Sequence, residues 1–548
     1  MKTFIKFLIF SLLFTYSIPG FSQLNLSWYS TSGYVNNTAN LMDGGDLDSS
    51  GNIYTCGSFV GPMYISGNDT GFSHGSYDYF ISKHDEFGNA IWTKTGGGSG
   101  HDKAVSLKLD NAGYIYLIVN SMTQNFYFGT DTISGNTNGD YFIFKIDPSG
   151  NLIWARPIIE VLDGNINELT LSGDGRKIFV CGTLTTDTLV LNNDTLTSNV
   201  TFNAMTIMLD TSANIIWARN VIGISNGSVL FSDITNNVYF SGSYSDTIII
   251  GQDTLPGSGV GNSFIMKYDS SGNQIWAKRF NTSNYTYISQ IKQNMYGDIF
   301  LCGVSASDSL VINQDILINH GHGDIFIAKI DSSGNEHWGK IIGSSQDEYL
   351  GGIVFDSDGN IYLGGAFSGT SITIGSSVLI NYNDQDFFSD ILLALFDSTG
   401  ANIWAMNAGG ENGESIVPLK VYNGKLVTAG NFGAPPLYFG NVTIFSNNPG
   451  DNFVAQFDIS TGNRENILSN QFTIYPNPTT GLINISCISP KTEKTNISVT
   501  NVFGKEFLNS NTIVSDHIQI DLSNFSNGIY FIRLESEFQT LTLRCVKL

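Results

Sequence analysis

The chain has 548 residues, of which 14% are charged and 12% aromatic, with 59 glycines and a formal net charge of −22. At about 150 residues per domain, this length allows several domains or one large repeat domain. The charge-poor, glycine-rich composition is typical of an extracellular β protein with many turns. The negative charge argues against nucleic acid as a partner, because phosphate binding needs a basic surface.

Residues 1–22 have the pattern of a secretory signal peptide. Two lysines precede an apolar run over 7–18, and small residues lead to a cut between Ser22 and Gln23. The run is too short to span a bilayer, and no cysteine follows the cut, so we expect neither a membrane anchor nor lipoprotein attachment. Removing the two lysines changes the formal charge from −22 to −24. No later apolar run is long enough for a transmembrane segment.

All seven tryptophans belong to one series with spacings of 59 to 66 residues. An aspartate lies seven residues before each of the last six, and an Asp or Asn lies seven residues earlier again. The tryptophans are Trp28, Trp92, Trp154, Trp217, Trp276, Trp338 and Trp404; the aspartates are Asp85, Asp147, Asp210, Asp269, Asp331 and Asp397; the earlier residues are Asp78, Asp140, Asn203, Asn262, Asp324 and Asp390. A seventh, degraded copy keeps Asp451 and Asp458 without a tryptophan. Such a period indicates a repeat architecture.

Each repeat predicts two hairpins and therefore four strands. One hairpin surrounds motifs such as "FIFKIDPSGNLIWARP" (142–157), and the other surrounds motifs such as "FDSDGNIYLGGAF" (355–367). Between them, segments such as "IIIGQDTLPG" (248–257) predict small hairpins that project from the rim. Four-stranded units repeated around an axis predict a β-propeller, here with seven blades.

The first tryptophan, Trp28, has no repeat hairpin before it, and the last repeat hairpin has no tryptophan. We expect segment 24–30 to be the outermost strand of the blade whose other strands come from 416–458, which would close the ring and protect its sheet edges. The predicted fold class is therefore all-β. It comprises a seven-bladed β-propeller over 23–465, closed by an N-terminal strand, and a small C-terminal β-sandwich over 466–548.

The half-repeats resemble the bacterial β-propeller repeat family (SBBP-like). Units of that family carry Asp-x-x-Gly-Asn-x-Tyr followed by Gly and end in Gly-Asn-x-x-Trp, and the resemblance covers about residues 24–464. It implies a propeller fold and a secreted setting, and it names no ligand.

The period breaks after residue 465, and residues 466–548 alternate strands and turns as a small β-sandwich does. This segment closely resembles the type A C-terminal sorting domain of the type IX secretion system. The residues that carry the likeness are Tyr475, Pro476, Asn477, Pro478, Gly481, Gly504, Lys505, Gly528, Tyr530 and Lys547. The resemblance implies export through the type IX translocon, processing by a sortase, and release or attachment to surface lipopolysaccharide.

Six Asp-(Ser/Thr)-aliphatic triplets on the small hairpins resemble the O-glycosylation acceptor of some bacteria with this secretion system. Their hydroxyl residues are Thr132, Thr188, Thr195, Thr247, Thr254 and Ser309. Hairpin geometry alone also explains these triplets, so glycan attachment is one of two interpretations.

The repeated aspartates could form a ring of cation ligands, but turn chemistry explains them without any ligand and is the favoured interpretation. Each opens an Asp-x-x-(Gly/Ala) turn, in which the carboxylate accepts backbone N–H groups. Asp78, Asp140, Asp324 and Asp451 sit at strand starts and predict Asx turns. Calcium remains an alternative at 43–52 and 355–360, although neither has the spacing of a calcium loop with a closing Glu. No other cofactor is predicted.

Three other residue types invite a functional interpretation. The tryptophans could stack on carbohydrate, but one register on every outer strand favours packing between blades. Cys56, Cys181 and Cys302 share a repeat position in blades that are not neighbours, which predicts small buried residues, whereas Cys487 and Cys545 could pair after export. His320 and His322 lack a third metal ligand and predict a surface loop.

These patterns predict a secreted or surface-attached propeller that acts as a non-catalytic binding or adhesion scaffold for lipopolysaccharide, a glycan or a matrix protein. The alternative is a secreted polysaccharide lyase or hydrolase with its site at the central channel. An enzyme should bring blade-specific ionisable residues together, and segments 344–349 and 409–414 could place carboxylates there. No catalytic residue is assigned, because no nucleophile elbow, zinc-binding helix motif or phosphate loop occurs.

Overall fold

The computed structural model describes residues 25–547 apart from 33–39, 65–69, 136–138, 160–163, 186–187, 192–193, 198–201, 224, 258, 260, 281–283, 383–387, 434–435, 440–441, 445–450, 460–471, 476–478, 488–493, 502–504, 514–516 and 536–539. The described residues form strands and turns without a helix, so the fold is all-β as predicted. Accordingly, they contain no helix that could span a membrane. The chain divides into two compact units, one over Leu26–Phe457 and the other containing Asp458–Leu548.

The first unit consists of antiparallel sheets with four core strands each, numbered here from first to outer strand. Sheet 1 has β2 (Asn40–Leu47), β3 (Ile53–Phe59), β6 (Asp78–His84) and β7 (Ala90–Gly97); sheet 2 has β8 (Asp102–Leu109), β9 (Ile115–Ser121), β12 (Asp140–Ile146) and β13 (Leu152–Ile159); sheet 3 has β14 (Gly164–Leu171), β15 (Lys177–Leu184), β18 (Asn203–Asp210) and β19 (Ile215–Asn220). Sheet 4 has β20 (Ser225–Ser232), β21 (Val238–Tyr244), β24 (Asn262–Tyr268) and β25 (Gln274–Phe280); sheet 5 has β26 (Thr286–Gln293), β27 (Ile299–Ser305), β30 (Asp324–Ile330) and β31 (Glu336–Ile342); sheet 6 has β32 (Glu348–Phe355), β33 (Ile361–Phe367), β36 (Asp390–Phe396) and β37 (Asn402–Gly409).

The last sheet of this unit combines the two ends of the repeat region. Sheet 7 has β38 (Glu414–Tyr422), β39 (Lys425–Phe432) and β42 (Asp451–Asp458), and its outer strand is β1 (Asn25–Ser32). The segment expected to be an outermost strand therefore lies beside β42, at the place where the other sheets have their tryptophan strand.

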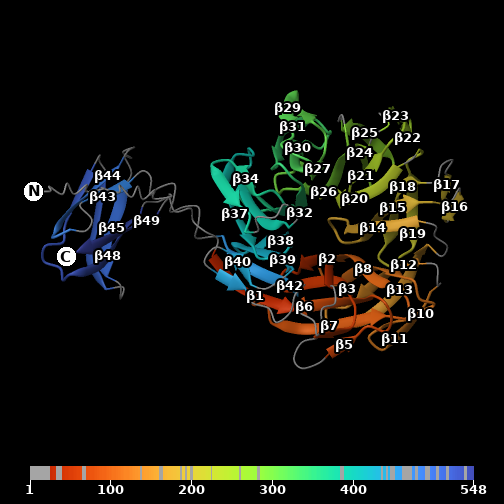
Figure 1. Cartoon of the computed structure of the whole chain (residues 1–548), viewed down its shortest axis with the longest axis horizontal. Helices are drawn as coiled ribbons and strands as arrows, with labels where there is room; N and C mark the ends of the chain where they lie inside the picture. The colour runs from red at the N-terminus through yellow and green to blue at the C-terminus, as the bar shows by residue number, and fades with distance from the viewer. Residues whose placement is uncertain are drawn as a thin grey trace, which may run out of the picture. The chain divides into compact units, whose positions relative to one another are not determined.

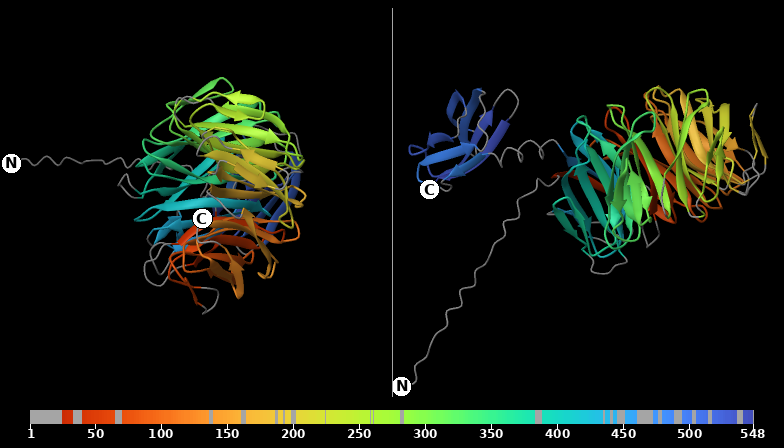
Figure 2. Two further views of the ribbon diagram at one scale, coloured as in Figure 1. Left: turned by 90° about the vertical axis from the view of Figure 1, so that its right-hand side faces the viewer. Right: turned by 90° about the horizontal axis from the view of Figure 1, so that it is seen from above.

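The first strands of successive sheets contact one another inside this unit. β2 contacts β8, and the series continues through β14, β20, β26 and β32 to β38, which in turn contacts β2. The red and cyan parts of the unit consequently lie side by side, and the outer strands and small hairpins lie at its periphery (Figures 1 and 2).

A small hairpin follows the second strand of each sheet. The hairpins are β4 (Pro62–Tyr64) with β5 (Thr70–Phe72), β10 (Asn125–Phe128) with β11 (Asp131–Ser134), β16 (Thr188–Leu191) with β17 (Asp194–Thr197), β22 (Ile248–Ile250) with β23 (Asp253–Leu255), β28 (Ser309–Ile312) with β29 (Asp315–Ile318), β34 (Ser371–Ile374) with β35 (Ser377–Ile380), and β40 (Leu437–Phe439) with β41 (Val442–Ile444). β10 pairs with β7, β40 pairs with β37, and Ile249 of β22 pairs with Ile222 just after β19. These three hairpins therefore pair with the backbone of the preceding sheet and do not simply project from the rim.

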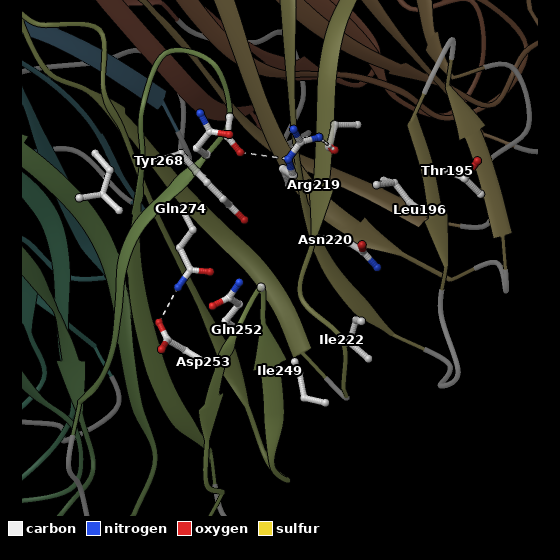
Figure 3. A pocket seen from close by; sticks show the side chains of 15 residues that line it. Thr195, Leu196, Arg219, Asn220, Ile222, Ile249, Gln252, Asp253, Tyr268 and Gln274 are labelled. Atoms are coloured by element: carbon white, nitrogen blue, oxygen red, sulfur yellow. Dashed lines mark hydrogen bonds between the residues drawn. The ribbon is translucent and has the colours of Figure 1, made fainter.

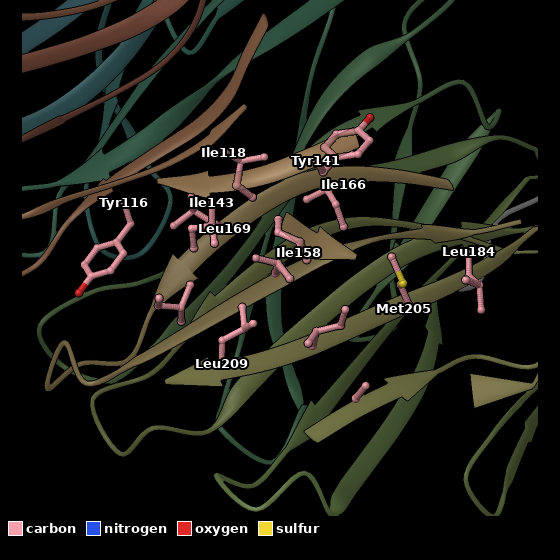
Figure 4. Packing of buried hydrophobic residues seen from close by; sticks show 14 of the residues in the cluster. Tyr116, Ile118, Tyr141, Ile143, Ile158, Ile166, Leu169, Leu184, Met205 and Leu209 are labelled. Carbon is pink, nitrogen blue, oxygen red and sulfur yellow. The ribbon is translucent and has the colours of Figure 1, made fainter. Parts of the chain in front are cut away.

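The hydrophobic core lies between neighbouring sheets. In the cluster of Figure 4, Tyr116, Ile118 and Ile143 come from sheet 2, while Leu169 and Met205 come from sheet 3, and all five are at most 1% exposed. The inner strands of a sheet bury side chains on both faces, as in the continuous buried runs of β3, β33 and β36. Neither sheet of a pair could bury this surface alone.

The tryptophans pack as the repeat predicts, at the outer side of these interfaces. Each of the last six has its ring centroid 6.0–6.5 Å from a tyrosine or phenylalanine ring of its own sheet's second strand. The indole N–H of Trp92 donates to the Pro148 carbonyl at 3.3 Å, and that of Trp276 donates to the Ser332 carbonyl at 3.2 Å. Both carbonyls belong to the turn of the next sheet.

The second unit has two sheets. One contains β43 (Phe472–Tyr475), β44 (Leu482–Cys487) and β47 (His517–Asp521); the other contains β45 (Lys494–Asn501), β46 (Glu506–Ile513), β48 (Gly528–Glu535) and β49 (Thr540–Lys547). Both contribute to one core, with Ile483 and Ile485 from the first sheet and Ile497, Val499 and Ile532 from the second.

The turn glycines provide a test of the sheet interface. Gly272 has a φ of 80°, and a Cβ there would lie 2.8 Å from the Trp217 ring. Gly113 has a φ of 82°, but its Cβ would make an ordinary 3.5 Å contact with Pro148. We expect Gly113→Ala to cost about 1–2 kcal/mol for the left-handed backbone alone. Gly272→Ala should cost about 1–3 kcal/mol more through overpacking, measured by urea denaturation. Equal losses would contradict a tight tryptophan contact.

Candidate functional site

The repeated aspartates belong to turns, as predicted. Asp147 accepts hydrogen bonds from the backbone N–H groups of Ser149 and Asn151, at 2.9 and 2.8 Å, and from the Asn151 amide at 3.0 Å. The corresponding aspartates accept the same backbone bonds two and four residues ahead: Asp85, Asp210, Asp269, Asp331 and Asp397. Their carboxylates are thus engaged in local structure.

The two alternative calcium segments form the same kind of turn. Asp48 accepts from the N–H groups of Ser50 and Asn52, and Asp356 accepts from those of Asp358 and Asn360. In the described part of the chain, no group of three or more His, Cys, Asp or Glu side chains is arranged to hold a metal ion.

The cysteines are buried, as predicted from their repeat position. Cys56, Cys181 and Cys302 are fully buried and pair across the sheet with Gly44, Glu168 and Gln290 at one register. They lie in sheets 1, 3 and 5, which are not neighbours. Cys545 is a buried free cysteine of the second unit. The Cys487 side chain lies outside the described residues, so the suggested pairing stays a prediction.

The two histidines also behave as surface-loop residues. His322 is exposed, and the His320 side chain is 55% exposed. Nδ1 of His320 lies 3.0 Å from a carboxylate oxygen of Asp324, and the His320 backbone N–H donates to that oxygen at 2.7 Å. His320 therefore caps a buried acid.

Asp324 is one member of a pair of carboxyl groups buried between two sheets. Asp324 begins β30 in sheet 5, and Glu348 begins β32 in sheet 6; they are 0% and 1% exposed. Glu348 accepts hydrogen bonds from the Ser344 N–H at 3.0 Å and the Ser344 hydroxyl at 2.5 Å. Burial, followed by the nearby Asp324, raises the pKa of Glu348 to about 8. The pair therefore retains a proton at neutral pH.

The same arrangement recurs at two other interfaces. Asp390 and Glu414 meet between sheets 6 and 7, and Asp78 and Asp102 meet between sheets 1 and 2, each at most 1% exposed. Burial and the nearby Asp390 raise the pKa of Glu414 to about 8, and burial raises that of Asp390 to about 6. Burial also raises the pKa of Asp78.

One loop geometry creates all three pairs. The second carboxylate accepts the backbone N–H four residues before it, from Gly98, Ser344 or Gly410. The residue before each N–H is Gly97, Gly343 or Gly409, where a Cβ would lie within 2.4 Å of the first carboxyl group. Segments 344–349 and 409–414 thus supply the interface acids Glu348 and Glu414, and the loop over 96–100 supplies the Gly98 N–H that Asp102 accepts.

A second group of ionisable residues comes from the first strands, where the sequence interpretation assigned none. Four partly buried side chains lie close together here: Asp46 of β2, Lys108 of β8, Glu168 of β14 and Lys292 of β26. We call them the inner-strand cluster. The other three all influence the pKa of Lys292, and the two lysines influence that of Glu168. Burial and the neighbouring Lys108 lower the pKa of Lys292 to about 8, although Glu168 and Asp46 oppose the shift. Burial raises the pKa of Glu168.

The acids of the inner-strand cluster hold neighbouring sheets together. Glu168 accepts the Leu230 N–H of sheet 4 at 2.9 Å, and Asp46 accepts the Leu109 N–H of sheet 2 at 3.1 Å. Gln290 makes the equivalent bond to the Ile353 N–H of sheet 6 at 2.7 Å. For Glu168 and Gln290 the sequence signal was a polar residue at a first-strand position that is Gly44, Val229 or Gly352 in other sheets.

A pocket of about 740 Å³ opens at the rim between sheets 3 and 4 (Figure 3). One wall is the end of β19 with hairpin β16–β17, and the other is hairpin β22–β23 with the turn before β25. The side chains that give it chemical character are those of Thr195, Arg219, Asn220, Gln252, Asp253 and Gln274. Sequence reasoning noted the β22–β23 segment only as a hairpin, because the pocket requires residues from two repeats.

The six acceptor-like hydroxyl residues lie on or beside the small hairpins. Five of them are exposed, and Ser309 is partly buried. Their accessibility is compatible with glycan attachment and equally with plain hairpin structure.

The structure places part of the sorting motif. Tyr475 pairs with Asn484, the Tyr530 hydroxyl donates to the Ser526 carbonyl at 2.7 Å, and the Lys505 ammonium lies 5.3 Å from the centre of the Phe507 ring. Gly481 approaches Ser523 so closely that a Cβ would lie 2.4 Å from its hydroxyl. Gly528 and Lys547 pair with each other at the ends of β48 and β49. Pro476, Asn477, Pro478 and Gly504, like Ser22 and Gln23 of the expected cleavage site, lie outside the described residues.

Residues 473–547 match the family described as the secretion system C-terminal sorting domain. This match confirms the resemblance of the C-terminal segment. The protein is therefore secreted or attached to the outer-membrane surface.

Other similarities are distant. An uncharacterised WD repeat-containing protein of Acanthamoeba polyphaga mimivirus is 23% identical over 258 residues, which cover 41% of this chain and only 18% of that relative. Prolyl oligopeptidase B from Galerina marginata aligns with 83% of this chain and 57% of its own at 9% identity and a TM-score of 0.40. A protein of unknown function from Bacteroides thetaiotaomicron aligns with 77% and 99% of the two chains at 11% identity and a TM-score of 0.26. These likenesses carry no argument about activity.

The buried acid pairs predict stability that falls as pH rises. Glu348 and Glu414 have folded-state pKa values of about 8, above about 4.3 for an unfolded glutamate. Their contribution to the free energy of unfolding is complete below the unfolded-state pKa. It is lost as pH rises through the folded-state pKa of about 8. We expect the melting temperature to fall between pH 5 and 9, and the Glu348→Gln, Glu414→Gln double variant to show a flatter profile.

Glu411→Gln is the matched control, because Glu411 lies in the same loop as Glu414 but is exposed. It should leave the slope of melting temperature against pH unchanged. A wild-type melting temperature that rises or stays level over this pH range would contradict the proton-holding pairs.

Proposed function

We propose that this secreted or surface-attached protein is a non-catalytic binding or adhesion scaffold. In this proposal its first unit is a seven-bladed β-propeller over residues 23–465, closed by the N-terminal strand. Residues 1–22 are the signal peptide, and residues 466–548 are the address read by the type IX translocon and a sortase. Lipopolysaccharide, a glycan or a matrix protein is the ligand class.

The contacts among the first strands support a closed ring. Each first strand contacts its successor, β38 contacts β2, and β1 completes the sheet of β38, β39 and β42. Two contacts between sequence-distant segments add to this support. The Lys420 ammonium donates to the Leu47 carbonyl at 3.2 Å, and the Tyr422 hydroxyl donates to the Ser49 carbonyl at 3.0 Å. These bonds join the last sheet to the first.

The observation that carries the binding role is that the buried acids are engaged in structural contacts between sheets. Glu168 and Asp46 accept backbone N–H groups of neighbouring sheets, and six further buried acids form the three interface pairs described above. A general acid or base must reach a substrate proton at hydrogen-bonding distance. Groups already engaged between sheets are poorly suited to this role, whereas the rim pocket offers exposed polar groups in a preformed recess.

The alternative, a polysaccharide-active enzyme, draws on one observation. Lys108 and Lys292 lie near Glu168 in the inner-strand cluster, and such blade-specific charges are what an enzyme would bring together. Because both acids of this cluster accept backbone N–H groups, Glu168 from Leu230 and Asp46 from Leu109, we favour binding.

The export part of the proposal is tested in a bacterium that has a type IX system. The full chain should appear in the medium or on the cell surface. A variant that lacks residues 473–547 should remain inside the outer membrane, because it has lost its address. The measurement is immunodetection in separated fractions, with Gln314→Ala, an exposed hairpin substitution, as an exported control. Arrival of the truncated chain at the surface at the control level would reject this route.

The binding part is tested with the folded full chain on an array of glycans and matrix proteins. We expect retention of at least one class of ligand, and no new reducing ends or unsaturated products when polysaccharides are incubated with the protein. Turnover of any polysaccharide, abolished by Glu168→Gln or Lys292→Met, would instead establish the enzymatic alternative. Absence of binding to every class would reject the scaffold role.

A further inference from the structure

The rim pocket has walls that are held in place by hydrogen bonds. The Arg219 guanidinium donates to the Gly272 carbonyl at 3.0 Å, which ties the outer strand of sheet 3 to the turn of sheet 4. The backbones of Ile222 and Ile249 exchange two hydrogen bonds, at 2.9 and 2.8 Å, beneath the hairpin β22–β23. A ligand would therefore meet a preformed recess and would not have to order it.

The polar side chains of the pocket are fixed in the same way. The Gln274 amide donates to Asp253 at 2.5 Å, and the Asn220 amide nitrogen donates to the Thr197 carbonyl at 2.9 Å (Figure 3). Each of these bonds uses one donor of the amide and fixes its plane. By contrast, the Gln252 amide and the Thr195 hydroxyl are exposed and make no hydrogen bond to the described residues. They remain able to bind a ligand.

The composition of the lining selects a class of ligand. It has one cation, Arg219, and one anion, Asp253, so its formal charge is zero. Amides and a hydroxyl supply both donors and acceptors. Between them lie Ile222, Ile249 and Ile275, which are 36%, 43% and 50% exposed and can receive apolar C–H surface. A neutral, hydroxyl-rich molecule with apolar ring faces satisfies all three features.

The neighbouring interface shows that this lining is not a general property of the repeat. Asn220 pairs with Met205 in sheet 3, and the residue at the same register in sheet 4 is Arg279, which pairs with Phe264. Arg219 is likewise replaced by Lys278. The interface of sheets 4 and 5 also has Asp315 and Glu336 where the pocket has Asp253 and Gln274. Its rim therefore carries four charged side chains at these places, whereas the pocket between sheets 3 and 4 carries two.

We propose that the pocket between sheets 3 and 4 binds a short neutral oligosaccharide, with Gln252 and Thr195 as direct contacts and Arg219, Asn220, Asp253 and Gln274 as the fixed polar frame. This assignment rests on the proposed binding function and names its site and its ligand class.

The test titrates the full chain with neutral hexaoses of glucose, mannose and xylose by isothermal calorimetry. At least one should bind. Loss of the Gln252 amide in Gln252→Ala should weaken that binding about three- to tenfold, the effect of one or two hydrogen bonds. Thr195→Trp, which fills the mouth from an exposed position, should abolish it. Gln314→Ala alters the same kind of exposed hairpin residue in sheet 5 and should leave it unchanged.

The outcomes separate this inference from the broader function. Neutral hexaose binding that is equal in all three variants would overturn the pocket assignment and leave a binding protein with its site elsewhere. Binding only to acidic glycans or to matrix proteins would overturn the ligand class while the scaffold role stands. If neither the hexaoses nor the array ligands bind, both proposals are rejected. Because Thr195 and Gln252 are exposed, circular dichroism should show that the variants are folded.

Discussion

The structure of the first unit depends on one contact, the packing of a tryptophan against the turn glycine of the next sheet. The glycines Gly150, Gly272, Gly334 and Gly400 have φ values between 76° and 85°, and a Cβ at each would lie 2.8–3.1 Å from a tryptophan ring of the preceding sheet. At these four turns glycine serves both the left-handed backbone and the closeness of the indole, whereas sheet 3 has Ala213 at the same turn position with a φ of 66°. This contact sets the spacing of the sheets at their outer side, and it makes the aspartate turn and the tryptophan strand parts of one interface.

At the inner side of the sheets the spacing is set by polar groups instead. Glu168, Gln290 and Asp46 each accept a backbone N–H of the following sheet. A buried N–H without a partner is costly, so a side-chain acceptor at this position stabilises the interface and orients the next strand. The acid pairs at Asp324 and Glu348, and at Asp390 and Glu414, lie at the other end of the first strands and couple the same interfaces to proton uptake.

Features carried by the repeat could be predicted from the sequence, and features that join particular residues of different sheets could not. The strand pattern, the aspartate turns, the buried cysteines and the place of the N-terminal strand all follow from residues that recur at a fixed period. The acid pairs were harder to foresee, because Asp324 and Glu348 are 24 residues apart and meet only through the close packing at Gly343. The inner-strand cluster joins four strands, and no spacing within one repeat indicates that Lys292 lies near Asp46. The rim pocket depends on two hairpins that belong to different sheets.

This difference suggests where selection for binding can act in such a fold. At the four glycine turns a larger residue would loosen an interface, since a Cβ there would lie within 3.1 Å of the tryptophan ring. The hairpins between the second and third strands carry no such constraint at their tips, where Gln252 and Gln314 are exposed. The end of the outer strand also accepts different side chains. Asn220 in sheet 3 and Arg279 in sheet 4 occupy the same register, and each donates a hydrogen bond to a backbone carbonyl of a hairpin segment. Substitutions at these places alter the charge and shape of a rim pocket while the sheets stay in register, so chemistry can vary from one interface to the next on an unchanged frame.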